Sequence, residues 1–187
     1  LRGLSERDGI RAIGIAGYSL GGNLPRKLAG ELGETAPPEL KAVCAVSPTM
    51  DLERCVDALE RRSNIAYQFN FVRNLKARMR RKAAAHPTLF SLDPLRRVWT
   101  VRQFDEAYTA PHHGFRDATD YYHRASAMRV IDRIQVPALI ITAEGDPFGP
   151  AYPGRDPAVT GQPHAARRHT APGGPRAHHA RAGGQAD

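Results

Sequence analysis

The stretch that decides the fold is "GYSLGGN", residues 17–23, which places a serine between glycines where an apolar run gives way to a helical pattern. The preceding "IRAIGIA" is apolar and isoleucine-rich, as expected for a buried parallel strand. Behind it, "LPRKLAGEL" spaces its leucines four residues apart and stops at Gly33, a residue typical of a helix C-terminus. A Gly-x-Ser-x-Gly run between strand and helix is typical of a nucleophile elbow.

Such an elbow makes Ser19 the candidate catalytic nucleophile, with its oxygen exposed at the carboxyl edge of the sheet. Glycines are expected there because a Cβ at Gly17 or Gly21 would clash where strand and helix approach closely. The positive end of the helix dipole favours an oxyanion, so the Leu20 N–H is the expected first oxyanion donor. The alternative is that Ser19 only caps the helix. Pro25 lacks an amide hydrogen, which favours a helix that starts after Leu20 or bends.

Alternating strands and helices predict an α/β fold with a mostly parallel sheet. Further buried strands are expected over residues 40–48 and 136–146, the latter after the amphipathic "ASAMRVIDRI". Residues 51–130 exceed the crossover of a dozen or more residues that parallel strands need, and their amphipathic patterns predict a helical cap insertion.

These patterns give four predicted segments. The core of the fold comprises 1–50, with the elbow, and 131–160, with an acidic loop, and it is interrupted by the cap at 51–130. The last segment, 161–187, contains no Ile, Leu, Val, Met, Phe, Tyr, Trp or Cys. Such a segment cannot bury enough apolar surface to offset its ordering entropy, so we predict a disordered tail without a strand or a core helix.

A serine nucleophile needs a base, normally histidine, held by a carboxylate that follows the serine in the chain. Asp146 in "LIITAEGDPFGP" comes just past the third predicted strand and is the candidate catalytic acid, although an Asp before a Pro is also a common turn former. Glu144 is a weaker candidate. Asp51 follows the second predicted strand, but it is better explained as the N-cap of the cap's first helix.

With Ser19 and Asp146 assigned, the chain resembles the YheT-like α/β-hydrolases, a family that includes plant embryogenesis-associated hydrolases and mammalian abhydrolase-domain lipid esterases. The matching text runs from residue 10 to about 163: "GYSLGGN", "VSPTMDL", "NFVRNLKARMRRK", "FDEAYTAPHHGFRDATDYYHRAS", "VPALIITAEGDPF" and "RDPAVTG". The resemblance implies a partial α/β-hydrolase fold, the catalytic pair Ser19 and Asp146, no metal or other cofactor, and hydrolysis of carboxylic esters, with lipid esters among the candidate substrates. In the cap, "NIAYQFNF" is expected either to line an acyl pocket or simply to pack.

Two departures from the family imply an impaired fragment. Family members have several strands before the elbow, one of which is followed by a loop with the second oxyanion amide, whereas this chain starts at Leu1; we expect a piece of a longer protein. The family also ends with an apolar strand and a Gly-Gly-His that carries the catalytic histidine. Here Gly173 and Gly174 match, but Pro175 stands at the histidine position. The tail offers three weak substitutes: His169, His178 and His179.

The remaining histidines and the cysteines carry no signal for a metal site. His112 and His113 lie in "APHHGF", without the carboxylate or cysteine pattern of a metal centre, and are expected to pack or face solvent. The same holds for His86 and His123. The two cysteines, Cys44 and Cys55, match neither a disulfide framework nor a zinc spacing.

The charge balance opens an alternative function, a non-catalytic fragment or basic module that binds anionic partners. Lys plus Arg number 27 against 19 Asp plus Glu, a net charge of +8. "RNLKARMRRK", residues 73–82, carries six cations and no acid, although a solvated helix face is the favoured explanation. Nucleic acid is not an expected partner, because no base-reading or stacking motif accompanies the charge. The expected partners are an ester substrate and, weakly, a membrane surface; the lack of a signal peptide or apolar span predicts a cytoplasmic protein.

Overall fold

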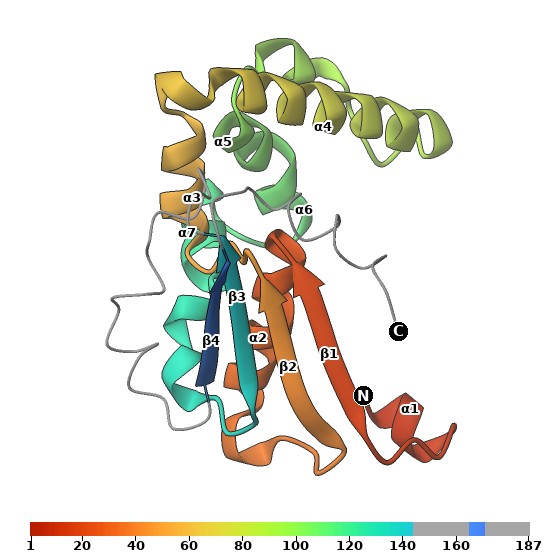
Figure 1. The fold of residues 1–187 in the computed structure, drawn as a ribbon. Helices are drawn as coiled ribbons and strands as arrows, with labels where there is room; N and C mark the ends of the chain where they lie inside the picture. The colour runs from red at the N-terminus through yellow and green to blue at the C-terminus, as the bar shows by residue number, and fades with distance from the viewer. Residues whose placement is uncertain (144–164, 171–187) are drawn as a thin grey trace, which may run out of the picture. The chain divides into compact units, whose positions relative to one another are not determined.

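The computed structural model describes residues 1–143 and 165–170 (Figure 1). The chain divides into two compact units, which are treated separately below: Leu1–Asp51 with Ser126–Asp187, and Leu52–Ala125. The predicted insertion, residues 51–130, covers nearly the same part of the chain as the second unit.

The first unit contains a parallel sheet in the order β1-β2-β3-β4. Its strands are β1 (Ile13–Tyr18), β2 (Leu40–Val46), β3 (Ala138–Ala143) and β4 (Ala165–Thr170). The helix α2 (Leu20–Leu32) connects β1 to β2 and packs on both (Figure 1). The short helices of this unit are α1 (Arg2–Glu6), η1 (Gly33–Thr35), η5 (Ala127–Arg129) and η6 (Ile131–Arg133). The predicted α/β class with a mostly parallel sheet is therefore confirmed.

The strand β4 contradicts the prediction that residues 161–187 contain no strand. It pairs with β3 from Ala138↔Ala165 to Ala143↔Thr170. A strand ladder is made of backbone N–H and C=O groups, and the edge of β3 offers a full row of them, so pairing needs no apolar side chain. The prediction of a tail without a strand rested on the lack of apolar residues. Apolar composition indicates whether side chains can be buried, but not whether the backbone can pair with a neighbouring strand. The other residues of the predicted tail, 161–164 and 171–187, lie outside the described residues.

Helix α2 makes its closest approaches through small residues, and the first leucine of the row that reveals it in the sequence faces solvent. Leu24 is 63% exposed, while Gly22, Ala29 and Gly30 are buried. A Cβ on Gly30 would overlap the backbone carbonyl of Val130. Small side chains at these positions let the helix approach its neighbours closely, while Leu32 adds a partly buried contact with the core cluster.

The helix boundaries of α2 differ in part from expectation. The helix begins at Leu20, so Pro25 lies inside it, and the expected later start is wrong. It ends at Gly33, whose φ of +48° belongs to the left-handed region that favours glycine. Around α2 a core cluster fills the first unit: Ala29, Leu40, Val43, Met50, Ile131, Ile134, Val136, Ala138 and Ile140.

The described second unit is built of helices. Its longest helices are α3 (Leu52–Leu59), α4 (Ile65–Ala85) and α7 (Ala118–Ala125). Between them lie η2 (Arg62–Asn64), η3 (Asp93–Arg97), α5 (Val101–Phe104), the π-helix η4 (Asp105–Thr109) and α6 (Ala110–His112). One core cluster joins Val72 and Met79 of α4 to Phe104 and Tyr108, and another joins α3 to α7.

Arg26 of α2 is a buried charge without a partner among the described residues. The side chain is 0% exposed, and its Nε, Nη1 and Nη2 atoms make no hydrogen bond. Desolvation lowers the pKa of Arg26 to about 10, against a smaller opposing effect of Cys44. Removing a guanidinium from water without compensating hydrogen bonds costs several kcal/mol, so this residue should weaken the first unit.

We expect Arg26→Met to raise the free energy of unfolding by about 1–4 kcal/mol, since an apolar side chain of similar length needs no partner. Urea denaturation followed by circular dichroism measures this. The matched control is Lys27→Met, which removes a paired cation on the same helix, 2.7 Å from Glu31, and should change stability by less than about 1 kcal/mol. A loss of stability in Arg26→Met would show that its guanidinium is paired after all.

Candidate active site

Ser19 lies at the turn between β1 and α2 in a backbone conformation that is rare for a side-chain-bearing residue. Its φ is +51° and its ψ is −124°. Such a conformation costs on the order of 1–3 kcal/mol and persists only where the surroundings enforce it. Here the Ser19 N–H donates to the Val46 carbonyl at 2.9 Å, and its carbonyl accepts from Gly22 N at 2.9 Å and from Thr49 N at 3.2 Å. The end of β2 and the following loop therefore hold the turn.

The side chain of Ser19 is exposed and is not used to cap the helix. Ser19 stands at the N-cap position of α2, but its side chain makes no cap hydrogen bond. The capping alternative therefore has no support in the structure. The first N–H groups of a helix, beginning here with Leu20, have no acceptor within the helix and carry its positive dipole end. An oxyanion formed at Ser19 would lie beside these N–H groups and be stabilised by their positive partial charge.

The glycines of the elbow do not contribute equally. A Cβ on Gly17 would overlap the backbone carbonyl of Gly21. A Cβ on Gly22 would lie 3.0 Å from the Gly17 oxygen and 3.1 Å from Cβ of Pro48. A Cβ on Gly21 would meet nothing within 4 Å, so the predicted clash at this position is wrong. The second close approach belongs to Gly22, because the helix turns that residue, and not Gly21, toward the sheet.

Two residues near the elbow were missed by sequence reasoning. Asn23 is buried, and its Oδ1 accepts a hydrogen bond from Ala127 N at 2.7 Å, which fixes the returning chain beside α2. Ser47 directly follows β2 with a φ of +42°, and its N–H donates to the Ile141 carbonyl at 2.7 Å. Asn23 could have been noticed in "GGN", but no local signal distinguishes Ser47. Two neighbouring strands thus each end in a serine with positive φ.

The predicted partners of Ser19 are only partly covered by the structure. Asp146 and Glu144 lie outside the described residues; β3, which leads to them, ends at Ala143 and runs parallel to β2 and β1. Carboxyl ends of parallel strands meet at the same edge of a sheet. His169 belongs to β4, in register with Thr142. The other tail positions, Pro175, His178 and His179, lie outside the described residues, and Asp51 directly precedes α3.

The described histidines of the second unit show no catalytic arrangement. The ring of His112 lies 4.8 Å from that of Phe90 and 6.4 Å from that of Tyr108, centroid to centroid, which places it in an aromatic cluster. His112 and His113 also line a cavity of about 440 Å³. Within residues 1–143 and 165–170, no group of three or more His, Cys, Asp and Glu could hold a metal ion.

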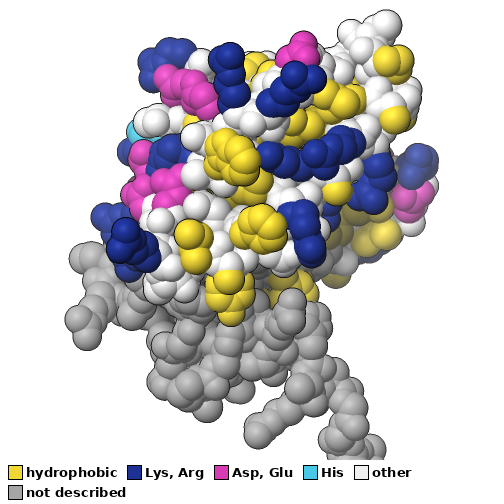
Figure 2. Space-filling model, turned by 90° about the horizontal axis from the view of Figure 1, so that it is seen from above, with side chains coloured by type: hydrophobic (Ala, Val, Ile, Leu, Met, Phe, Trp, Pro, Cys, Tyr) yellow, Lys and Arg dark blue, Asp and Glu magenta, His cyan; other side chains and the backbone are white. Residues whose placement is uncertain are grey.

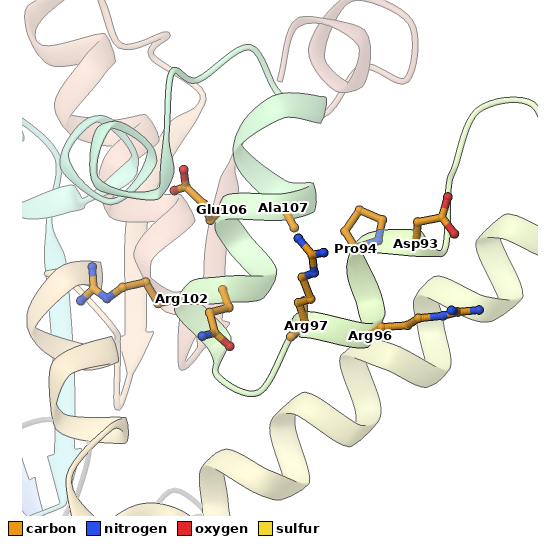
Figure 3. Close-up of a pocket in the computed structure, with 9 residues that line it drawn as sticks. Asp93, Pro94, Arg96, Arg97, Arg102, Glu106 and Ala107 are labelled. Carbon is orange, nitrogen blue, oxygen red and sulfur yellow. The ribbon is translucent and has the colours of Figure 1, made fainter.

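A larger open pocket of about 870 Å³ lies in the second unit (Figure 3). Its charged residues are mostly engaged elsewhere: Arg102 lies 2.6 Å from Asp57, and Glu106 accepts from Ala118 N at 2.7 Å. Arg96 and Arg102 point in opposite directions in Figure 3. The pocket is lined by Asp93, Pro94, Arg96, Arg97, Val98, Arg102, Gln103, Glu106 and Ala107. This lining contains no serine, cysteine or histidine and so offers no pair of the kind expected for Ser19.

The partly buried carboxylate of Asp105 in the second unit has a structural role. Both oxygens of Asp105 accept hydrogen bonds, at 2.7 Å from the Tyr122 hydroxyl and at 2.6 Å from the Thr109 hydroxyl. Burial raises the pKa of Asp105, and the two hydroxyl donors oppose this shift. The network joins the π-helix to α7, and its atoms are already occupied by protein partners. Ser19 is therefore the candidate site that the described residues support best.

The chain is similar to known esterases and lipases over most of its length. It is 41% identical over 150 residues to "Putative esterase YheT" of Escherichia coli (strain K12), a match covering 79% of this chain and 44% of that protein. It is 28% identical over 138 residues to phospholipase ABHD3 of Mus musculus, covering 73% and 33%. A shorter match of 47% over 55 residues, 29% of this chain, links it to medium-chain fatty acid ethyl ester synthase/esterase 2 of Saccharomyces cerevisiae, of which it covers 12%. The chain spans less than half the length of these relatives.

Solved structures align with the chain at low identity. The proline iminopeptidase of Mycobacterium smegmatis aligns with a TM-score of 0.46 and 15% identity, covering 95% of this chain and 63% of that one. The bromoperoxidase of Bacillus anthracis aligns with a TM-score of 0.47 and 14% identity, covering 95% and 66%. No family model matches the chain.

Proposed function

Because the chain, over the 150 residues that match, belongs to the YheT-like family of α/β-hydrolases, we propose that the whole protein is a serine hydrolase of carboxylic esters. The parallel sheet with α2 packed behind its first strands is accordingly part of an α/β-hydrolase fold. The single observation that carries the proposal is the conformation of Ser19, an exposed serine held at a φ of +51° at the start of a helix.

In the proposed reaction the Ser19 oxygen attacks the carbonyl carbon of the ester, and its proton passes to a histidine oriented by Asp146. The Leu20 N–H, at the positive end of α2, donates to the oxyanion of the tetrahedral intermediate. The carbon–oxygen bond to the alcohol then breaks, and the alcohol leaves with the proton from the histidine. Water hydrolyses the acyl-enzyme and restores the serine.

Lipid esters are the substrate class that the relatives favour. The relatives named above include a phospholipase and a fatty acid ethyl ester synthase/esterase. In the second unit, Ile65, Tyr67 and Phe71 of "NIAYQFNF" are exposed apolar side chains. The acyl length and the alcohol are not specified by these features.

This chain is expected to react slowly, because Pro175 stands where the family has its catalytic histidine. Loss of one triad member lowers the catalytic rate by several powers of ten. Some rate enhancement remains, because the oxyanion donors and substrate binding still act. The alternative, a non-catalytic fragment or basic module, predicts no serine-specific chemistry at all. The two can be separated with a covalent probe.

We expect a fluorophosphonate probe to label the folded chain slowly and at Ser19. Ser19→Ala should abolish labelling, because the nucleophilic oxygen is removed. Ser47→Ala is the matched control: this serine also has a positive φ but is buried, so its replacement should leave labelling in place. Circular dichroism first establishes that each variant folds, and mass spectrometry of tryptic peptides locates the label. A folded chain still labelled in Ser19→Ala would contradict the assignment of Ser19, and a folded chain that takes no label would favour the non-catalytic alternative for this chain.

A further inference from the structure

One face of α4 combines exposed apolar and basic side chains. Ile65, Phe69, Arg73, Lys76 and Arg80 follow one another at spacings of four, four, three and four residues, which places them along one side of the helix. Trp99, from the segment after η3, joins them, since Lys76 Nζ lies 4.9 Å from the centroid of its ring. These six residues are called the α4 face below.

The apolar half of the α4 face is open to solvent. Ile65 is 65% exposed, Phe69 is 69% exposed and Trp99 is 72% exposed. Single exposed apolar residues are ordinary, but a group of large ones beside cations marks an interaction surface. Figure 2 shows hydrophobic side chains interspersed with Lys and Arg on the side of the molecule seen from above.

The α4 face is not needed to hold the helix in the fold. Helix α4 is anchored by a narrow stripe in which Val72, Met79 and Ala83 are buried, and Val72 and Met79 pack with Leu95 and Phe104. Phe69, Arg73 and Arg80 lie beside this stripe and are exposed. Packing within the fold therefore does not account for these exposed side chains.

The basic half is not neutralised by acids along the chain. Residues 61–92 contain eight Lys and Arg and no Asp or Glu. Arg73 bonds only a neutral partner among the hydrogen bonds found here, the Asn70 side chain at 3.1 Å. Lys76 extends over the Trp99 ring, which places a positive charge beside the most exposed aromatic side chain of the α4 face. An anionic surface complements this arrangement.

We propose that the α4 face binds the surface of an anionic phospholipid membrane, with Phe69, Trp99 and Ile65 inserted among the headgroups and Arg73, Lys76 and Arg80 against the lipid phosphates. An amphipathic helix with aromatic and basic residues binds the membrane interface in this way, and tryptophan prefers that depth. No helix in the described part of the chain is long and apolar enough to cross a bilayer. Aliphatic Ile65 fits a lipid surface better than a nucleic acid, where apolar contact is made chiefly by stacking rings.

Membrane binding can be followed by the intrinsic fluorescence of Trp99, because this residue is the one tryptophan of the chain. We expect vesicles of phosphatidylcholine with phosphatidylglycerol to shift Trp99 fluorescence to shorter wavelength and to bind the chain in sedimentation, at least tenfold more tightly than phosphatidylcholine alone. Lipids brominated on the acyl chain should quench this fluorescence, which requires Trp99 at the membrane. Sedimentation without any spectral shift or quenching would overturn the proposal.

Matched variants test the α4 face itself. Arg73→Gln/Lys76→Gln/Arg80→Gln should weaken binding to anionic vesicles at least tenfold, since each charge near such a surface adds about 1 kcal/mol. The charge control Arg11→Gln/Arg129→Gln/Arg133→Gln removes three exposed cations from the first unit and should change binding less than threefold. Phe69→Ser should weaken binding about fivefold or more, against little change in Leu4→Ser, an exposed leucine of the first unit. Equal losses in the variants and their controls would overturn the proposal.

The same experiment also tests nucleic acid, the competing class of anionic partner. Single-stranded RNA is added to the vesicle-bound chain at moderate salt, and RNA should not displace it. Displacement, together with RNA binding that depends on Arg73, Lys76 and Arg80, would replace the lipid proposal with a nucleic-acid one. None of these readouts uses ester hydrolysis, so they stand apart from the proposed reaction.

Discussion

Gly17→Ala is expected to destabilise the chain by about 3 kcal/mol or more and to abolish labelling of Ser19. The added Cβ would overlap the carbonyl of Gly21 in the first turn of α2. The backbone fixes the position of the Cβ, and the Gly21 carbonyl is itself backbone, so neither atom can rotate away. Overpacking costs about 1–3 kcal/mol even where side chains can yield. Relief requires α2 to shift from β1, which would also release the strained turn at Ser19. Urea denaturation and fluorophosphonate labelling measure the two effects.

The matched control is Gly21→Ala, four residues further along the same motif. Nothing lies within 4 Å of a Cβ at this position, which is inside α2. Replacing a helical glycine by alanine in open space should stabilise the chain by about 0.5–1 kcal/mol. A Gly17→Ala chain as stable as Gly21→Ala would contradict the close approach at Gly17 and with it the geometry of the elbow.

The parts of the fold that the sequence could predict are those set by local patterns. The apolar runs before Ser19 and around Val43 and Ile140 correspond to β1, β2 and β3. Strands β2 and β3 contribute Val43 and Ile140 to the core, as buried parallel strands do. The burial expected for β1 is wrong, because this strand lies at an edge of the described sheet and buries only Ile13. The end of α2 at Gly33 was also predictable, since a left-handed terminus favours glycine. In the candidate site, the motif located the turn that holds Ser19.

Other features depend on where distant segments lie and carry no local signal. The strand β4 forms through backbone pairing with β3. The polar composition of this segment gives no indication of that pairing. The roles of Gly21 and Gly22 are distinguished by what faces each Cα, namely open space in one case and Pro48 in the other. The burial of Arg26 also depends on packing, since its position among helical polar residues predicts an exposed side chain.

The largest gain in activity is expected from Pro175→His, which places histidine where the YheT-like family has Gly-Gly-His. A positioned general base typically contributes 10²–10⁴ in rate, so labelling of Ser19 and hydrolysis of a p-nitrophenyl ester should rise about 10²-fold or more. Adding Ser19→Ala should remove the whole gain. Adding Asp146→Asn should remove most of it, because the imidazole loses the carboxylate that orients it.

Position specificity decides whether the gain reflects a restored triad. Ala177→His adds an imidazole two residues further along the same tail and should leave the rate within about threefold of the parent chain. If both substitutions raise the rate equally, a loosely held histidine suffices, and the assignment of residue 175 to the base is wrong. If Pro175→His leaves the rate unchanged while Ser19 remains labelled, the base comes from elsewhere, and His169, which β4 places beside β3, becomes the first residue to replace. The outcome thus identifies which proton acceptor serves the strained serine.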